Sequence, residues 1–319
     1  MKRRNSLQLL AAMPFAPLTV RAQAVGKVGY VNPGPRSDER IETLRSGLKL
    51  ANPAFAQTEI VSESANGDPD QVAPLIARVM ATRPNVFVAA GPAALRQARQ
   101  ASDSVPIVAY DFETDPVGEG YAQSLARPGG SVTGLFLDVP TFVAKWIEFL
   151  RECLPQLRKI ALLGDPGAGT MQGDTLARMA SGLGIATELL PMKGREDLAG
   201  TVAAAKERGA GAIILLSSPL IFVNARELAG LTLSHHLPAI TMFAEFARSG
   251  GLLAYGPNLL GALRQAGTMA GKILAGALPA TLPIERPTTF ELVVNLNTAE
   301  RLGVAVPPVL KARADEVIE

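Results

Sequence analysis

The sequence of 319 residues has very little of what disulfide, metal and redox sites require: one cysteine, Cys153, and two adjacent histidines, His235 and His236. A single cysteine cannot form an intrachain disulfide, and its place in an apolar, helix-like segment predicts a small buried side chain. The histidine pair lacks the further ligands that a zinc site needs and is typical of the polar end of a helix. We therefore expect no metal and no cofactor.

Motifs of the common enzyme classes are also absent. The sequence has no Walker A loop, no Gly-x-Ser-x-Gly elbow and no cysteine–histidine pair with catalytic spacing. The segment from Gly164 to Gly169 is rich in glycine and follows an apolar run, but it does not match a dinucleotide-binding fingerprint. We therefore predict that the protein has no catalytic residues and is not an enzyme.

Beyond residue 24, no stretch is long and apolar enough to cross a bilayer. The first 24 residues differ from the rest, because Lys2-Arg3-Arg4 precedes an uncharged, largely apolar stretch from Leu7 to Val20. Ala22-Gln23-Ala24 then fits the small-x-small pattern that signal peptidase accepts. The apolar stretch is too short for a membrane anchor, so residues 1–24 are predicted to be a cleaved signal peptide.

Cleavage at this point changes the charge of the chain. It removes four of the 31 basic residues and none of the 29 acidic ones, so the net charge becomes −2 instead of +2. A nearly neutral chain without basic clusters argues against nucleic acid as a partner. The cleavage point has no cysteine, so we expect a soluble protein that is not lipid-anchored, in the periplasm of a Gram-negative cell.

The remaining sequence alternates short apolar, β-branched runs with longer amphipathic stretches. Near-continuous apolar strands separated by helices are typical of parallel sheets covered on both faces, so the predicted class is α/β, doubly wound. Strands are expected at 27–32, 58–62, 85–90, 106–110, 159–164, 185–190, 212–216, 239–242, 252–255 and 291–295. Helices are expected at 39–50, 69–82, 93–101, 142–153, 175–183, 196–208, 224–235 and 259–275.

The chain also repeats itself loosely. Prolines next to predicted strands recur at offsets of 127 to 133 residues, in the pairs Pro33 and Pro166, Pro92 and Pro219, and Pro106 and Pro238. Three matched turns predict two lobes with the same βαβαβαβ plan. We expect lobe 1 at 25–134 plus about 257–283 and lobe 2 at 135–256 plus about 284–319. The glycines between 129 and 134 predict a hinge-like first crossing.

Two open sheets joined by several crossings form a cleft, and ligands bind such sheets at the C-terminal ends of the strands. Gly91-Pro92-Ala93 and Ser217-Ser218 lie between a strand and a helix, where free backbone N–H groups suit a carboxylate. Plain capping by Ser218 is the alternative. Asn32, and Asp165 in the matching loop of the second half, either hydrogen-bond a solute or only close their own turns.

Acidic residues follow the fourth predicted strand, where Asp111, Glu113 and Asp115 cluster beside aromatic neighbours. Of these we expect Asp111 and Asp115 to pair with a ligand ammonium, although Asp115 can instead cap a turn. Glu245 is the candidate in the matching loop of the second half. Tyr255 either reaches the cleft or packs in the core.

Several sequence blocks recur together in one family: 29–32, 115–117, 124–134, 250–258, 290–296 and 312–316. In this combination the chain resembles the ABC-transporter substrate-binding family that includes the tryptophan-binding TrpX-type proteins. The resemblance implies a type I periplasmic-binding fold with two lobes and a hinge. It also implies a receptor that delivers a small solute to a membrane permease. The loop Gly164-Asp165-Pro166-Gly167 differs from the Asn-Ser-Ser run of the TrpX branch, whose members bind aromatic amino acids.

From residues and resemblance together, we predict a periplasmic solute-binding component of an ABC-type importer. Its expected ligand is an amino acid or another aromatic or carboxylate compound, held between the lobes. The expected partners are this solute and the ABC permease subunits, with no nucleic acid, and the expected state is a monomer. The alternatives are a periplasmic ligand-sensing protein that presents its ligand to a membrane receptor, and an exported α/β enzyme.

Overall fold

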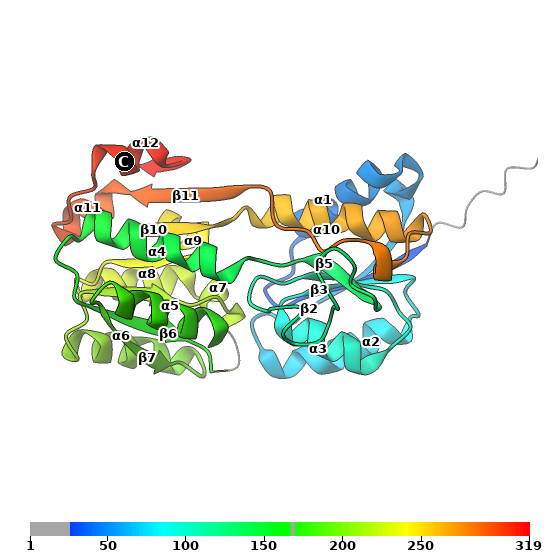
Figure 1. Cartoon of the computed structure of the whole chain (residues 1–319), viewed down its shortest axis with the longest axis horizontal. Helices are drawn as coiled ribbons and strands as arrows, with labels where there is room; N and C mark the ends of the chain where they lie inside the picture. Colours follow the sequence, from blue (N-terminus) through cyan, green and yellow to red (C-terminus); the bar gives the residue numbers. More distant parts are fainter. Residues whose placement is uncertain (1–25, 167–169) are drawn as a thin grey trace, which may run out of the picture.

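The computed structural model describes residues 26–166 and 170–319, which form two α/β lobes side by side (Figure 1). The predicted signal peptide lies outside the described residues. The first lobe has a parallel sheet of order β2-β1-β3-β4-β5, and the second has a sheet of order β12-β11-β10-β9-β8-β6-β7. The predicted fold class is confirmed, with one difference: β10 and β11 pair antiparallel. None of the helices in 26–166 and 170–319 has the length and apolar character that a membrane span needs.

The central strands form where the sequence is apolar, whereas the edge strands β2 and β7 carry polar residues. All five residues of β3 are buried, as are five of the six in β1 and in β6, because helices cover both faces of each sheet. The strands are β1 Lys27–Asn32, β2 Glu59–Ser64, β3 Val86–Ala90, β4 Ile107–Tyr110, β5 Val132–Leu135, β6 Lys159–Gly164, β7 Ala186–Pro191, β8 Ala212–Leu215, β9 Ala239–Thr241, β10 Leu253–Pro257, β11 Phe290–Asn295 and β12 Glu316–Ile318.

The eight expected helices are present, with ends that differ by a few residues, and the first turn of the second is a 3-10 helix, Pro69–Gln71. Four short helices, α7, α9, α11 and α12, are additional. The helices are α1 Asp38–Ala51, α2 Val72–Ala81, α3 Pro92–Ala101, α4 Val139–Cys153, α5 Thr170–Gly182, α6 Leu198–Glu207, α7 Pro219–Val223, α8 Ala225–Ser234, α9 Ala244–Arg248, α10 Leu259–Leu274, α11 Leu296–Leu302 and α12 Pro308–Arg313. Cys153 ends α4 and is buried, as expected.

The two lobes share one plan, as the proline pairs predict. The order β2-β1-β3-β4 in the first sheet matches β7-β6-β8-β9 in the second, strand for strand. The loops after corresponding strands therefore face one another across the boundary between the lobes. This arrangement places the two sets of strand C-terminal ends on opposite sides of one cleft.

The glycines between 129 and 134 predict the first crossing between the lobes at that place, but the structure does not have it there. Residues Val132–Leu135 instead form β5, which pairs with β4 at the edge of the first sheet. Gly134 has φ +139°, and a Cβ there would lie 2.2 Å from the backbone oxygen of Ala109. The glycine therefore permits close strand packing, and the chain crosses only after β5.

Three crossing segments join the lobes (Figure 1). The first runs from β5 to α4, the second from β10 to α10, and the third leads back to β11. They hydrogen-bond to one another, because Phe136 donates its N–H to the Glu285 carbonyl (3.2 Å) and Asn258 to the Thr289 carbonyl (2.9 Å). Helix α10 thus packs on α1 in the first lobe although its neighbours in sequence, β10 and β11, lie in the second lobe.

Candidate functional site

A cavity of about 80 Å³ lies between the lobes. The loops after β1, β3 and β4 line it from the first lobe, and those after β8 and β9 from the second, as expected for facing open sheets. Its lining consists of Asn32, Pro33, Gly34, Arg40, Ala90, Gly91, Tyr110, Phe112, Glu113, Ser217, Ser218, Pro219, Phe222, Met242, Phe243 and Leu259. A wider groove of about 940 Å³ between the 113–121 loop and α5 shares Glu113 with this cavity.

Glu113 is the acidic side chain of the cavity. Its Oε1 accepts a hydrogen bond of 2.7 Å from the Ser217 hydroxyl of the other lobe. Its Oε2 is buried and has no hydrogen-bond partner. Burial, together with the nearby charges of Asp111 and Asp165, raises the pKa of Glu113 to about 8. The carboxyl group therefore holds its proton at neutral pH, and one of its two oxygens has no hydrogen-bond partner.

A second contact supports this bridge between the lobes. The side chain of Gln172, in α5, accepts a hydrogen bond of 2.9 Å from the Ser217 N–H. Its amide donates to the carbonyl of Phe112 in the first lobe at 3.4 Å. Ser217 is therefore fixed at both its backbone and its hydroxyl, which holds it opposite Glu113.

Arg40 is the basic side chain of the cavity. Helix α1 presents it, and this helix begins with a cap in which the Ser37 hydroxyl accepts from the Arg40 N–H at 3.3 Å. The guanidinium lies beside the hydroxyls of Tyr30 and Tyr110 and 5.3 Å from the ring centroid of Phe222 in the other lobe. Burial raises the pKa values of Tyr30 and Tyr110 even though Arg40 opposes both shifts, so the arginine is flanked by two neutral phenols.

Aromatic and apolar side chains form the rest of the lining. The rings of Phe222 and Phe243 meet edge to face at 5.2 Å, and those of Tyr110 and Phe112 do so at 4.9 Å. Met242 adds a flexible apolar surface beside them. The site thus combines one carboxyl group, one guanidinium and several aromatic faces, a lining suited to a small organic solute.

Several predicted residues lie at this site, with different roles. Gly91 and Ser217 line the cavity, and Ser218 lines it while its hydroxyl accepts from the Ile221 N–H at 3.2 Å as the cap of α7. Asn32 also lines it, but its side chain closes its own turn, donating to the Pro35 carbonyl at 2.7 Å. The capping and turn interpretations therefore hold for Ser218 and Asn32, and a role in ligand binding stays a prediction for all four.

Other predicted residues border neighbouring hollows. Pro92, Ala93 and Asp165 line a hollow of about 290 Å³ that also includes Gly91. Asp115 lines the wider groove, and its Oδ1 accepts from the Val117 N–H at 3.0 Å, which is the turn-capping role.

Asp111 differs from the expectation that it faces a ligand. It is fully buried, accepting from the Glu113 N–H at 2.9 Å and from the Thr114 hydroxyl at 2.6 Å. Burial raises its pKa to about 6. Asp111 lines none of the inter-lobe hollows described above. Its hydrogen bonds instead stabilise the loop that presents Glu113.

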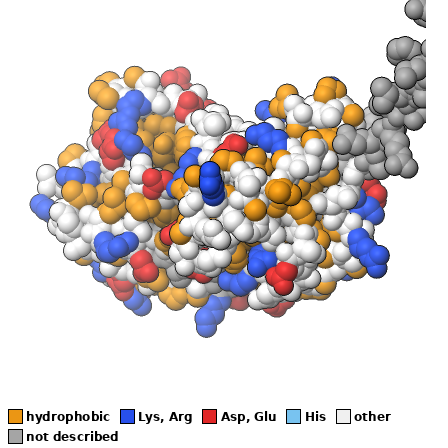
Figure 2. Space-filling view, turned by 45° about the vertical axis from the view of Figure 1, so that its right-hand side comes forward, with side chains coloured by type: hydrophobic (Ala, Val, Ile, Leu, Met, Phe, Trp, Pro, Cys, Tyr) orange, Lys and Arg blue, Asp and Glu red, His pale blue; other side chains and the backbone are white. Residues whose placement is uncertain are grey.

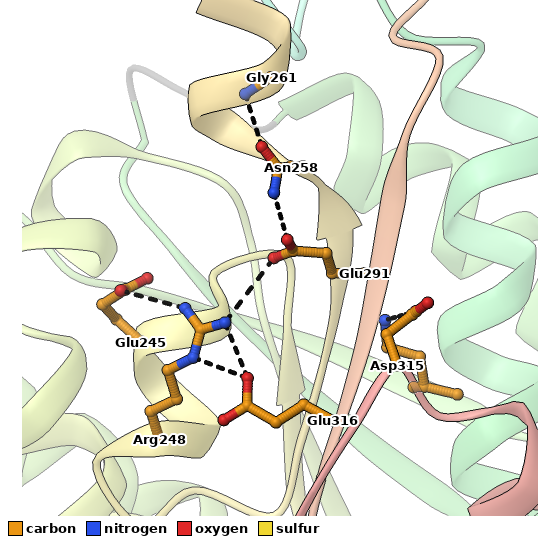
Figure 3. Close-up of polar contacts among 8 residues, drawn as sticks. Glu245, Arg248, Asn258, Gly261, Glu291, Asp315 and Glu316 are labelled. Carbon is orange, nitrogen blue, oxygen red and sulfur yellow. Dashed lines mark hydrogen bonds and ion pairs between the residues drawn. The ribbon is translucent and has the colours of Figure 1, made fainter. Parts of the chain in front are cut away.

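Glu245 belongs to an ionic network beside the crossings (Figure 3). Arg248 lies 3.4 Å from Glu245, 3.9 Å from Glu291 and 2.8 Å from Glu316. Asn258 caps α10 through the Gly261 N–H and donates to Glu291 on β11. This network ties the C-terminal strand to two of the crossings. Glu245 also lines a hollow of about 370 Å³ that includes Arg40.

Tyr255 packs in an aromatic cluster instead of lining these hollows. Its ring stacks on those of Phe142 and Phe290, each at 5.8 Å, and meets Phe149 edge to face at 5.1 Å. Its carbonyl accepts a hydrogen bond of 2.8 Å from the Trp146 indole. The packing interpretation therefore describes Tyr255.

Arg40 and Gln172 were not predicted as site residues, and Glu113 was noted only as part of its acidic cluster. In the sequence, Arg40 is one of several charges at the start of an amphipathic helix, and Gln172 follows a loop with no motif. No signal in the sequence marks either one. Within the described parts of the chain, no group of three or more His, Cys, Asp or Glu side chains is placed to hold a metal ion.

On the face shown in Figure 2, Lys and Arg side chains are interspersed with Asp and Glu. Neither sign of charge forms a large continuous area on this face. Ion pairs such as Arg36–Asp38 and Arg195–Glu227 are exposed at both side chains, and each contributes little to stability.

Comparison with known proteins gives a family and several similar folds. Residues 31–318 match the sequence model of the family described as ABC transporter substrate binding protein. No curated protein matches the sequence at a significant level.

Solved structures share the two-lobed fold. A structure from Streptococcus pneumoniae, described as an ABC domain in complex with L-Trp, has a TM-score of 0.82 at 22% identity, covering 92% of this chain and 99% of that one. A conserved domain protein from Vibrio cholerae gives 0.81, also at 22% identity and with the same coverage. A 5-methylthioribose transporter solute binding protein from Thermotoga lettingae gives 0.58 at 15% identity, covering 90% and 96%.

Proposed function

The chain belongs to the ABC transporter substrate-binding protein family, and from this premise we propose that it captures a small zwitterionic solute, an amino acid, between its lobes. Members of this family bind small-molecule solutes and deliver them to ABC permease subunits. The proposed action is binding without catalysis. Closure of two lobes on the solute is a hinge motion, and the permease would read the closed form.

One observation carries the choice of solute. The cavity between the lobes includes both the buried carboxyl group of Glu113, with its unpartnered Oε2, and the guanidinium of Arg40. A buried polar atom without a partner costs stability, so a ligand group that satisfies it is favoured. An ammonium group suits Glu113, and a carboxylate suits Arg40, which can bind it with two parallel hydrogen bonds.

The aromatic lining supports an apolar side chain on the solute. Rings such as Phe222 and Phe243 offer large apolar faces, and aromatic contacts contribute beyond the area they bury. The similar structure from Streptococcus pneumoniae was solved with L-Trp. This supports an aromatic amino acid as the first candidate for the present chain.

We further propose that the protein is exported through its N-terminal segment and acts in the periplasm as a monomer. The basic and apolar pattern of residues 1–24 supports export. The mixed charges of the mature chain support a small molecule, and not nucleic acid, as its ligand.

A thermal-shift screen of the protein tests the proposal. The compounds are the amino acids, aromatic acids lacking the amine, and sugars as controls. A solute at 100 times its Kd stabilises the folded protein by about 2.7 kcal/mol, so binders should raise the melting temperature clearly. We expect aromatic amino acids to do so. If only sugars do so, or if no compound does, the proposed solute class is wrong.

A further inference from the structure

Glu113 and Ser217 form a contact across the cleft that has no evident structural purpose for either lobe alone. The Ser217 hydroxyl of the second lobe donates to Oε1 of Glu113 at 2.7 Å, so this oxygen takes part in a contact between the lobes. Oε2 of the same carboxyl group is buried without a partner. A buried carboxyl group with one hydrogen-bonded oxygen and one oxygen without a partner is costly unless a further group satisfies it. Such a group is a candidate for direct contact with a ligand.

The charges around this carboxyl group are mostly acidic. Asp111, on the same loop, and Asp165, from the second lobe, both act on Glu113, and both disfavour its ionised form. The wider groove beside it carries charges of both signs, on Arg96, Asp115, Glu119, Asp174 and Arg178. The basic group of the 80 Å³ cavity is Arg40, on α1. A cation placed at Oε2 would therefore meet a negative neighbourhood.

We infer that Glu113 is the specificity-determining residue for a protonated amine, and that it gives up its own proton when the solute's ammonium group occupies the place beside Oε2. This inference rests on the proposed function and deepens it, because it names the group that recognises the amine. The neutral carboxyl group of Glu113 releases one proton to the solvent, and the carboxylate that remains forms an ion pair with the ammonium group of the solute. Ser217 keeps its hydrogen bond to Oε1 in both states.

The exchange makes binding depend on pH in a stated direction. With a pKa of about 8 before binding, only the ionised fraction of Glu113 can pair with the ammonium, and the apparent Kd is divided by that fraction. Affinity should therefore rise about tenfold from pH 6 to pH 7 and several-fold more from pH 7 to pH 8. If Glu113 instead kept its proton and donated it to an acceptor of the solute, affinity would fall above pH 8.

The test uses matched probes that differ by one charged group. The probes are L-tryptophan, indole-3-propionate, which lacks the amine, and tryptamine, which lacks the carboxylate. Isothermal titration in buffers of different ionisation enthalpy gives the Kd and the number of protons released. We expect L-tryptophan to bind at least tenfold more tightly than indole-3-propionate, with release of up to one proton at pH 7.

Two variants assign this preference to Glu113. Glu113→Gln keeps the shape and the neutral state of the side chain, so it should melt near the wild-type temperature without solute. It should lose the preference for the amine and the proton release. Ser217→Ala should weaken all binding but keep the preference. If Glu113→Gln retains the preference and the pH dependence, the inference is wrong although the proposed function stands.

An infrared measurement of the ligand-free protein is independent of any solute. At pH 7 the wild-type protein should show the carbonyl stretch of a protonated carboxyl group that is missing from Glu113→Gln. If this difference is absent, the proton exchange is wrong. If the band is present but none of the three probes binds, the failure belongs to the proposed solute class.

Discussion

The contact between α1 and α10 allows a quantitative test of how the first lobe is assembled. Gly47 of α1 faces Gly267 of α10, and a Cβ at residue 47 would lie 2.1 Å from the backbone oxygen of Arg264. It would also lie 2.9 Å from the Cα of Gly267. Backbone atoms in a packed helix cannot swing away as a side-chain tip can, so Gly47→Ala must push the helices apart.

The expected size follows from two opposing effects. Overpacking a tight contact costs about 1–3 kcal/mol, and the short backbone approach here places the cost near the upper end. Alanine gains about 1 kcal/mol over glycine in helix propensity. We therefore expect Gly47→Ala to lower the free energy of unfolding by about 2 kcal/mol.

Gly230→Ala is the matched control. Gly230 is an exposed glycine in the middle of α8, and a Cβ there meets no atom within 4 Å. This substitution should stabilise the protein by up to about 1 kcal/mol. Urea unfolding followed by circular dichroism compares the two variants. If Gly47→Ala is as stable as Gly230→Ala, the close approach of α10 to α1 is wrong.

Three further predictions concern the site. Arg40→Gln should raise the Kd for L-tryptophan at least tenfold in isothermal titration, because the solute carboxylate loses its charged partner. The control is Arg36→Gln, at an exposed ion pair, which should leave the Kd unchanged. Asp111→Ala should lower the free energy of unfolding by about 1–3 kcal/mol in urea, because the Glu113 N–H and the Thr114 hydroxyl lose their acceptors; an unchanged unfolding curve would contradict its role in the loop. The raised pKa of Glu113, about 8 against 4.5, means that the folded protein keeps a proton which the unfolded chain releases. The contribution of this group to stability should therefore be fully present below about pH 4.5 and be lost as pH rises from there toward 8, by up to about 1.4 kcal/mol per pH unit. Glu113→Gln should flatten that part of the profile, and equal slopes for both proteins would refute it.

The fold class followed from the sequence because central parallel strands such as β3 and β4 carry no charged residue and their helices are amphipathic. Elements with a weaker signal were not predicted. Helices α7 and α9 have only five residues each, too few for a helical period to show. Strand β5 has four residues, and its glycine suggested a hinge, although that glycine allows contact with β4.

The site was predicted in its loops but less well in its side chains. The proline repeat identified the loops that carry Asn32, Gly91 and Ser217, because loops after equivalent strands must face one cleft. Which member of the acidic cluster faces that cleft depends on the local turn. Both carboxylate oxygens of Asp111 accept hydrogen bonds within the loop, whereas Glu113 lines the cavity. Arg40 reaches the cavity only because of how α1 packs, which no local pattern reveals.

A crystal structure of the protein with bound L-tryptophan tests the central claim most directly. We expect the solute between the lobes, with its ammonium group within hydrogen-bond distance of Glu113 Oε2 and its carboxylate directed to Arg40. The indole should lie against the aromatic lining that includes Phe222. A solute bound outside this cavity, or one whose carboxylate faces Glu113, would contradict it.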